Sequence, residues 1–168
     1  MEWKTLYLPL ALVLLALIVL AVKAGGRYPY RRKRWLFTKA EWHFFQALSQ
    51  ALNPQFLIMG KVRIADLLGV EGIKPSSSRW WKAFGRISSK HVDYVICNPR
   101  SGEILCAIEL DDRSHQRKER RERDHFVNRA CEQAGLPLLR VKVQARYSRD
   151  ALLMAVNNAV SEQGASKP

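Results

Sequence analysis

Acidic side chains interrupt two apolar segments near the middle of the chain. Asp93 lies within the predicted strand His91–Cys97, and Glu109 and Asp111 lie near the end of the predicted strand Ile104–Asp111. A carboxylate among apolar strand residues is costly unless it is paired, hydrogen-bonded or bound to a metal ion. These residue types point to a metal site, and the alternative is a solvated acidic strand end that nearby arginines neutralise.

The turn between the two strands is expected to bring these acids together. Residues 100–102 predict a three-residue hairpin loop in which Gly102 adopts the left-handed conformation, and this register places Asp93 opposite Glu109. Opposed side chains have Cβ atoms about 4.5 to 5.5 Å apart, and Asp111 lies on the same face as Glu109. Two carboxylates about 5 Å apart repel by roughly 3 kcal/mol at an effective dielectric of about 20. We therefore expect a hard divalent cation, Mg²⁺ or Mn²⁺, between them.

Apolar periodicity predicts the elements that position these acids. A capping box formed by Thr38 and Glu41 begins a helix that ends near Leu52. The remaining elements are a strand near 57–66, a helix over 79–87, strands over 91–97 and 104–111, a helix over 114–134, a strand over 137–143 and a helix over 149–160. This order predicts an α/β fold with a mixed four-stranded sheet.

The acidic strands also resemble a known family. Val92-Asp93-Tyr94, the run from Ile108 to His115, Arg123-Asp124 and the run from Pro137 to Arg140 are similar to domain of unknown function 2726. That domain is a member of the PD-(D/E)XK nuclease superfamily, and the resemblance covers about Tyr28 to Met154. The run from Glu109 to His115 is also similar to the E-x-D-G-x-x-H pattern in relatives of the very-short-patch repair endonuclease. The resemblance implies a restriction-endonuclease-like αβββαβ core in which Asp93 and Glu109 bind the catalytic metal.

One residue departs from the superfamily pattern. The usual lysine two residues after the second acid is replaced by Asp111, so either catalysis is lost or another residue takes the role. The repair-endonuclease-like pattern would make His115 a general base, although a histidine at a helix start can simply hydrogen-bond to the preceding aspartates. Lys61 and Lys90 are weaker candidates for a displaced lysine.

Further residues are candidates for the metal and for phosphate. Superfamily members often add an acid from the first helix to the metal site, which would be Glu41, but the capping box also explains a glutamate there. Arg140 is expected near the active edge of the sheet, where it could hold a phosphate. The alternative is that it forms an ion pair with Asp124. The helix after the acids carries a basic face that either contacts nucleic acid or is merely solvated; its members are Arg113, Arg117, Arg120 and Arg121.

The charge balance agrees with an anionic partner. The chain has 28 Lys and Arg against 15 Asp and Glu, a formal net charge of +13, which excludes an acidic scaffold. Hydrophobic residues make up 48% of the chain, enough for a packed core. Three cysteines cannot all pair, and we expect reduced thiols in the cytosol.

The N-terminal segment predicts a membrane anchor. The run Leu6–Val22 holds seventeen uncharged residues, about 26 Å as a helix, and six cationic residues follow between Lys23 and Arg34. These features predict a single pass through the inner (cytoplasmic) membrane with the N-terminus outside. A cleaved signal peptide or a helix buried in a soluble protein are the alternatives. The expected division is a transmembrane segment over 1–23, a basic linker over 24–36, a nuclease-like domain over 37–162 and a disordered tail over 163–168.

Three functions remain open at this point. The leading expectation is a membrane-anchored, cytoplasm-facing nuclease-like domain that hydrolyses phosphodiester bonds of nucleic acid, with DNA as the expected substrate. In it, Asp93 and Glu109 hold Mg²⁺ while Asp111 and His115 position the attacking water. The others are a catalytically silent nucleic-acid-binding module and a membrane-tethered interaction protein.

Overall fold

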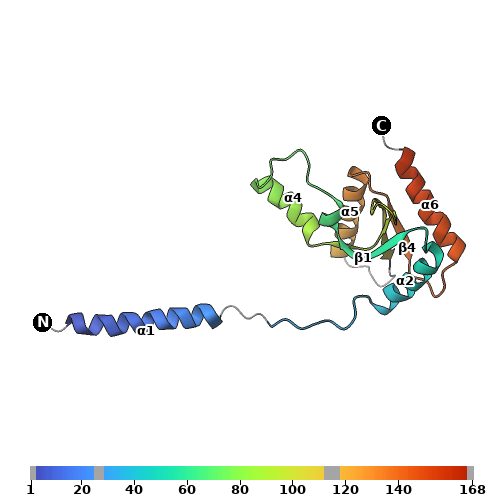
Figure 1. Ribbon diagram of the computed structural model, residues 1–168. Helices are drawn as coiled ribbons and strands as arrows, with labels where there is room; N and C mark the ends of the chain where they lie inside the picture. The colour runs from blue at the N-terminus through green and yellow to red at the C-terminus, as the bar shows by residue number, and fades with distance from the viewer. Residues whose placement is uncertain (1–2, 25–28, 112–117, 166–168) are drawn as a thin grey trace. The chain divides into compact units, whose positions relative to one another are not determined.

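Two compact units make up the chain. The computed structural model describes residues 3–24, 29–111 and 118–165. The first unit, Met1–Trp35, contains helix α1 (Trp3–Ala24), and the second, Leu36–Pro168, contains all the other elements (Figure 1). The candidate site lies entirely in the second unit.

A mixed four-stranded sheet forms the centre of the second unit. Its strands are β1 (Leu57–Arg63), β2 (His91–Cys97), β3 (Ile104–Asp111) and β4 (Leu138–Lys142), in the order β1-β2-β3-β4. The first two pairings are antiparallel, and β4 lies parallel to β3. The predicted α/β architecture with a mixed sheet is confirmed, and β2 and β3 have the predicted bounds.

Helices cover both faces of the sheet. Helices α2 (Lys39–Leu52) and α6 (Arg149–Ala165) pack on one face, where Phe44 and Leu48 meet Tyr94 and Ile108. The other face carries α3 (Ile64–Leu67), α4 (Ser78–Ser88) and α5 (Lys118–Gln133) (Figure 1). The three cysteines are free and buried, so they belong to the packed layers.

Some element bounds differ from the predicted ones. Strand β1 ends at Arg63, three residues early, because Ile64 turns into the core as the start of α3. Helix α5 is described from Lys118, and the predicted start at Ser114 lies outside the described residues. Helix α6 runs to Ala165, into the segment that was expected to be a disordered tail.

The hairpin between β2 and β3 has the predicted register near the acids. Tyr94 pairs with Ile108 and Ile96 pairs with Cys106, which places Asp93 and Glu109 at the next opposed position. The register shifts by one residue between Ile96 and Cys97, so the predicted pairing is wrong beside the turn. The loop itself fits the expectation, because Gly102 has φ 73° and its N–H donates to the Asn98 carbonyl at 2.9 Å.

Strand β1 is interrupted at Lys61. Its pairs with β2 continue on both sides, Gly60 with Tyr94 and Val62 with Val92, but the ladder skips Lys61 and Asp93. Lys61 has φ 56°, the left-handed region that a residue with a Cβ rarely occupies. This irregularity lies at the candidate site, where strained backbone tends to cluster.

The predicted transmembrane helix is wrong. Helix α1 covers the expected segment, but no helix among the described residues combines enough length with enough apolar character to cross a membrane. The uncharged run Leu6–Val22 spans about 26 Å as a helix, short of the roughly 30 Å hydrocarbon core of a bilayer. The same finding overturns the expected single-pass topology and inner-membrane localisation.

Candidate active site

A polar cleft of about 340 Å³ lies where the acids of β2 and β3 meet. Residues of α2, β1, β2, β3, α5 and β4 all contribute to it. They are Glu41, Lys61, His91, Asp93, Glu109, Leu110, Asp111, Arg123, Asp124 and Arg140. The two strand acids and Asp111 therefore share one cleft, as the hairpin register predicts.

Lys61 joins two acids in this cleft. Its Nζ donates to Oε1 of Glu41 at 2.7 Å and to Oδ1 of Asp93 at 2.8 Å. Burial lowers the pKa of Lys61, but the hydrogen bonds with Asp93 and Glu41 outweigh burial and raise it overall. Lys61 is thus an ammonium ion at neutral pH, held between the carboxylates of Glu41 and Asp93.

Glu41 both caps helix α2 and lines the cleft. Its Oε2 accepts from the Thr38 N–H at 2.8 Å, and Oγ1 of Thr38 accepts from the Glu41 N–H at 3.3 Å, so the capping box is present. Its other oxygen reaches Lys61 in the cleft. The cap holds the carboxylate at the start of α2, and the hydroxyl of Tyr94 donates to the Glu41 carbonyl at 2.6 Å.

Glu109 is the buried acid of the cleft. It is 6% exposed, and burial together with the nearby charge of Asp93 raises its pKa to about 7. Its Oε1 is buried and has no hydrogen-bond partner among the described residues. Arg123 lies 3.9 Å from that oxygen, too far for a hydrogen bond. The carboxylate of Asp93, in contrast, has a backbone hydrogen-bond donor: its Oδ2 accepts from the Leu110 N–H at 3.0 Å.

Arg140 links three polar groups at the opposite side of the cleft. Its Nη1 donates to Asp111 at 2.6 Å and its Nε donates to Asn128 at 2.9 Å, while its Nη2 lies 3.6 Å from Asp124. Asp111 is therefore its main partner, and Asp124 is a longer ion pair. The Nη2 atom is buried and has no hydrogen-bond acceptor in the described part of the chain.

Four residues that line the cleft were not among the predicted site residues: His91, Leu110, Arg123 and Asp124. His91 and Asp93 are two residues apart on β2, so strand alternation alone places both on one face. Burial, Lys61 and Arg123 lower the pKa of His91, which makes it a neutral imidazole at pH 7. Arg123 reaches the cleft from α5; Arg123-Asp124 was part of the family resemblance, but Arg123 was not expected in the site.

Several predicted residues lie elsewhere. Lys90 is not in the cleft; its Nζ donates to the Arg86 carbonyl at 2.6 Å and sits over the Phe126 ring. Lys90 lies in the chain between α4 and β2, so its side chain is close to Arg86 of α4. His115, Arg113 and Arg117 lie outside the described residues, as do the side chains of Arg120 and Arg121.

Asp93 and Glu109 are the residues of the cleft that could hold a cation. Among the described residues, no group of three or more His, Cys, Asp or Glu side chains is arranged to hold a metal ion. Mg²⁺ commonly binds through one or two carboxylates, with waters and substrate phosphates completing its shell. Asp93 and Glu109 form such a pair, and the unpartnered Oε1 of Glu109 is the kind of oxygen that a hard cation requires.

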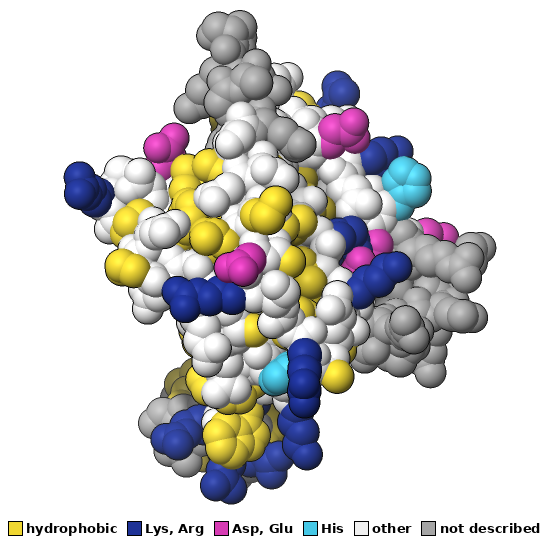
Figure 2. Space-filling view, turned by 90° about the vertical axis from the view of Figure 1, so that its right-hand side faces the viewer, with side chains coloured by type: hydrophobic (Ala, Val, Ile, Leu, Met, Phe, Trp, Pro, Cys, Tyr) yellow, Lys and Arg dark blue, Asp and Glu magenta, His cyan; other side chains and the backbone are white. Residues whose placement is uncertain are grey.

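Net charge alone does not locate a nucleic-acid surface. On the face seen in Figure 2, Lys and Arg side chains are spread among acidic, apolar and uncharged ones. Local arrangement, and not the total of +13, must therefore identify where an anion binds.

Comparison with known proteins identifies the family of the chain. A family described as protein of unknown function (DUF2726) matches residues 33–159, a range that includes every residue of the cleft. No curated protein and no solved structure matches the chain. Because this match spans most of the 168 residues, the chain belongs to the DUF2726 family.

Proposed function

We propose that this chain is a divalent-metal-dependent nuclease-like domain that hydrolyses phosphodiester bonds of nucleic acid, with DNA as the first substrate to test. One observation carries the proposal: within the part of the chain that the structure describes, Oε1 of Glu109 is a buried acceptor without a donor, and Nη2 of Arg140 is a buried donor without an acceptor. Unpartnered buried polar atoms are costly. A cation bound to a phosphate group would satisfy both atoms at once.

The charge of the cleft supports a divalent ion. Five acidic and three basic residues line it, so its formal charge is −2 when every acid is ionised and His91 is neutral. Burial is the main cause of the raised pKa of Glu109, and the negative charge of Asp93 adds to it. When bound to Asp93 and Glu109, Mg²⁺ would polarise a phosphodiester and lower the pKa of an attacking water.

Lys61 supplies positive charge beside the metal-binding acids. Its hydrogen bonds to Glu41 and Asp93 keep it protonated, so it suits stabilisation of a phosphate oxygen and not removal of a proton. In the superfamily pattern that Asp93 and Glu109 resemble, a lysine on the third strand helps to orient the water. Lys61 provides the same chemical group from β1.

The proton acceptor and the phosphate clamp come from other elements. His91 is neutral and lines the cleft, which makes it the described group best suited to accept a proton from water. Asp111, which was expected to position the water, is bound by Arg140 and is a poorer candidate. Arg123 and Arg140 lie where they can hold a phosphate.

A nucleic-acid-binding module without turnover is the second candidate. The observation that favours it is Asp111 at the position of the usual lysine, engaged by Arg140 at 2.6 Å. Its fold and its basic residues would serve binding alone, because fold does not determine function.

A cleavage assay separates these two candidates. The full chain is incubated with single- and double-stranded DNA and RNA in Mg²⁺, Mn²⁺ or chelator. We expect metal-dependent cleavage that Asp93→Asn and Glu109→Gln each reduce by at least about a hundredfold, since the metal contributes several kcal/mol. Mn²⁺ binding measured by titration calorimetry should weaken in the same variants.

Asp66→Asn is the matched control. Asp66 is an exposed carboxylate paired with Arg63 outside the cleft, so its amide variant should cleave and bind Mn²⁺ like the unmodified chain. If the unmodified chain binds nucleic acid and cleaves none with either metal, the binding module replaces the nuclease. Cleavage that survives both cleft variants would also defeat the proposal.

A further inference from the structure

The ammonium group of Lys61 fills the space between two acids of the cleft. Its Nζ lies 2.7 Å from Oε1 of Glu41 and 2.8 Å from Oδ1 of Asp93. The side chains of Lys61 and Glu41 are 17% exposed and that of Asp93 is 13% exposed, so water screens these ion pairs less than pairs on the surface. The position between Glu41 and Asp93 is therefore one that favours a positive charge.

The backbone directs Lys61 to this position. Its φ of 56° is rare for a residue with a Cβ, and the pairing of β1 with β2 skips Lys61 and Asp93. A residue keeps such a conformation where its surroundings outweigh the strain. The two ion pairs of Lys61 are contacts of that kind, so the placement of the ammonium is a property of the local fold.

Glu41 is oriented toward the ammonium by contacts of its own. Its Oε2 accepts from the Thr38 N–H at 2.8 Å, and its carbonyl accepts from the hydroxyl of Tyr94 at 2.6 Å. The capping box thus uses one carboxylate oxygen, and the other, Oε1, binds Lys61. Glu41 can hold the ammonium without any movement of α2.

Asp93 belongs to two pairs of acids. The first pair is Asp93 with Glu41, which the ammonium joins. The second pair is Asp93 with Glu109, which lies at the opposed position of β3. Glu109 is 6% exposed, and its buried Oε1 has no hydrogen-bond partner among the described residues. The second pair thus contains a carboxylate oxygen that suits a metal ion, whereas the first pair already has its cation.

The charge of the cleft agrees with one divalent ion beside the ammonium. With every acid ionised and His91 neutral, the formal charge of the cleft is −2, which a single divalent ion balances. Without the charge of Lys61 the formal charge would be −3, and a second divalent ion would be attracted. Paired metal ions in proteins lie about 3.5 to 4 Å apart, a separation that a shared carboxylate such as Asp93 can bridge.

We propose that the ammonium of Lys61 takes the place of a second metal ion, so that the cleft binds a single divalent cation through Asp93 and Glu109. This inference rests on the proposed function and sets its metal requirement. Glu41 is then a positioning residue for Lys61 and not a ligand of the metal. The ammonium supplies the positive charge that a second ion supplies in two-metal sites.

Counting bound Mn²⁺ ions by titration calorimetry tests the inference in the full chain. The unmodified chain should bind one ion. Lys61→Gly, which removes the ammonium and tolerates φ 56°, should bind two. Lys61→Gly/Glu41→Gln should return to one, because the second ion loses a ligand. Electron paramagnetic resonance should show that the two ions of Lys61→Gly are coupled to each other, since ions about 3.5 to 4 Å apart interact and a remote surface ion would not.

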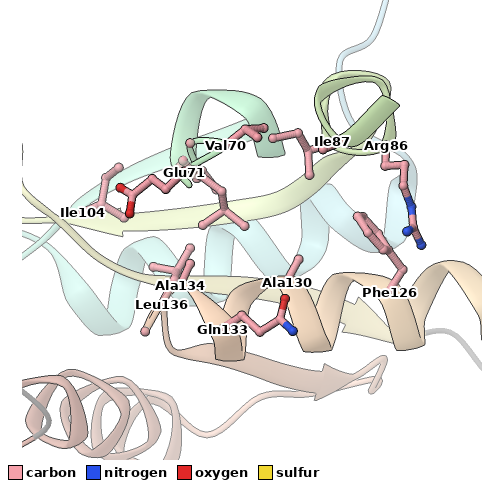
Figure 3. Close-up of a pocket in the computed structure, with 15 residues that line it drawn as sticks. Val70, Glu71, Arg86, Ile87, Ile104, Phe126, Ala130, Gln133, Ala134 and Leu136 are labelled. Atoms are coloured by element: carbon pink, nitrogen blue, oxygen red, sulfur yellow. The ribbon is translucent and has the colours of Figure 1, made fainter. Parts of the chain in front are cut away.

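Further variants control for folding and for general charge. Lys61→Ala should also bind two ions, which preserves the test if Lys61→Gly does not fold. Lys90→Ala removes the same charge outside the cleft and should still bind one. Glu71 lines a different pocket, the groove between α4 and α5 that Figure 3 shows, so Lys61→Gly/Glu71→Gln should keep both ions. Asp93→Asn in the Lys61→Gly chain should weaken both, because Asp93 belongs to both pairs.

The outcomes separate this inference from the proposed function. If the chain cuts no nucleic acid but Lys61→Gly gains a coupled second ion, the role of Lys61 stands and the nuclease fails. If the chain cuts DNA with Mn²⁺ but Lys61→Gly and Lys61→Ala still bind one ion, the role of Lys61 fails alone. Two coupled ions in the unmodified chain, or a second ion that survives Glu41→Gln, would also contradict it.

Discussion

At the scale of single residues, the cleft contains two unusual groups. Glu109 is a buried carboxyl whose pKa is raised to about 7, and Lys61 is a lysine in the left-handed conformation held between Glu41 and Asp93. Each costs the fold free energy that a simpler residue would avoid. Because strain and desolvation cluster at functional sites, both groups support a site at this place.

Replacing Glu109 with Gln should change how stability depends on pH. Between about pH 4.5 and about 7 the folded chain keeps a proton on Glu109 that the unfolded chain releases. Stability is therefore greatest below this window and falls as the pH rises through it, by up to about 3 kcal/mol. Thermal unfolding in chelator should show that fall between pH 5 and pH 8, and Glu109→Gln should flatten it.

Asp66→Asn serves as the comparison for Glu109→Gln. The hydrogen bond from Arg63 lowers the pKa of Asp66, so this exposed acid is ionised throughout the pH 5 to 8 window. Its variant should keep the unmodified pH dependence in that window. A Glu109→Gln variant as sensitive to pH as the unmodified chain would show that the carboxyl is ionised when folded.

Lys61 allows a test of backbone strain. Both Lys61→Gly and Lys61→Ala remove the ammonium that joins Glu41 and Asp93, but only glycine adopts φ 56° without a steric penalty. We expect Lys61→Gly to be more stable than Lys61→Ala by about 1 kcal/mol in urea unfolding. The same pair of substitutions at Lys82, in the interior of α4, should reverse this order by a similar amount. Equal stability at position 61 would mean that the left-handed conformation is not retained.

At the scale of elements, aromatic packing fixes α2 against the strand that carries Lys61. The Phe37 ring lies over Gly60, where an added Cβ would come within 2.4 Å of its Cζ. The ring is also stacked with Phe45 at 5.5 Å and with Tyr94 at 5.6 Å. The glycine therefore permits the close approach that brings Glu41 of α2 to the cleft.

Gly60→Ala should test this contact. The new methyl group must displace Phe37, and overpacking of this kind costs about 1 to 3 kcal/mol. Phe37→Leu should leave room for the methyl group, so the double variant should lose less stability than the two single variants together. Additive losses in a urea-unfolding cycle would place the strain somewhere other than this contact.

At the scale of the whole molecule, the packed core belongs to the second unit. Both apolar clusters consist of residues between Phe37 and Val160, one on each face of the sheet. The family match begins at residue 33, close to the start of this unit at Leu36. The unit thus has its own core and its own site.

A fragment that begins at Leu36 should fold without the first unit. Because none of the described residues before Leu36 belongs to either cluster, removing residues 1–35 should shift the thermal midpoint by less than about 4 °C. Differential scanning calorimetry of the fragment and of the full chain measures that shift. A much larger loss of stability would show that the N-terminal residues take part in the core.

Local patterns in the sequence determined most of the elements. The alternation in His91–Cys97 and Ile104–Asp111 defined two strands to the residue, and the capping box of Thr38 and Glu41 began α2 where expected. The hairpin register placed Asp93 and Glu109 opposite each other. These features depend on neighbours close in the chain, so the sequence contains them directly. The N-terminal run was misjudged: its uncharged residues and the cations after it predicted a membrane span, but no helix among the described residues is long and apolar enough to be one.

Only the tertiary structure decided which distant residues complete the site. Lys61, Arg123 and Arg140 come from β1, α5 and β4. Lys61 and Arg140 were candidates from the sequence, but so was Lys90, and only the fold shows which of the 28 Lys and Arg line the cleft. Their selection depends on the left-handed turn at Lys61, the parallel pairing of β3 with β4 and the packing of α5 on the sheet. Local pattern fixes the acids of the cleft, whereas the cations that balance them depend on contacts across long stretches of sequence, which only folding establishes.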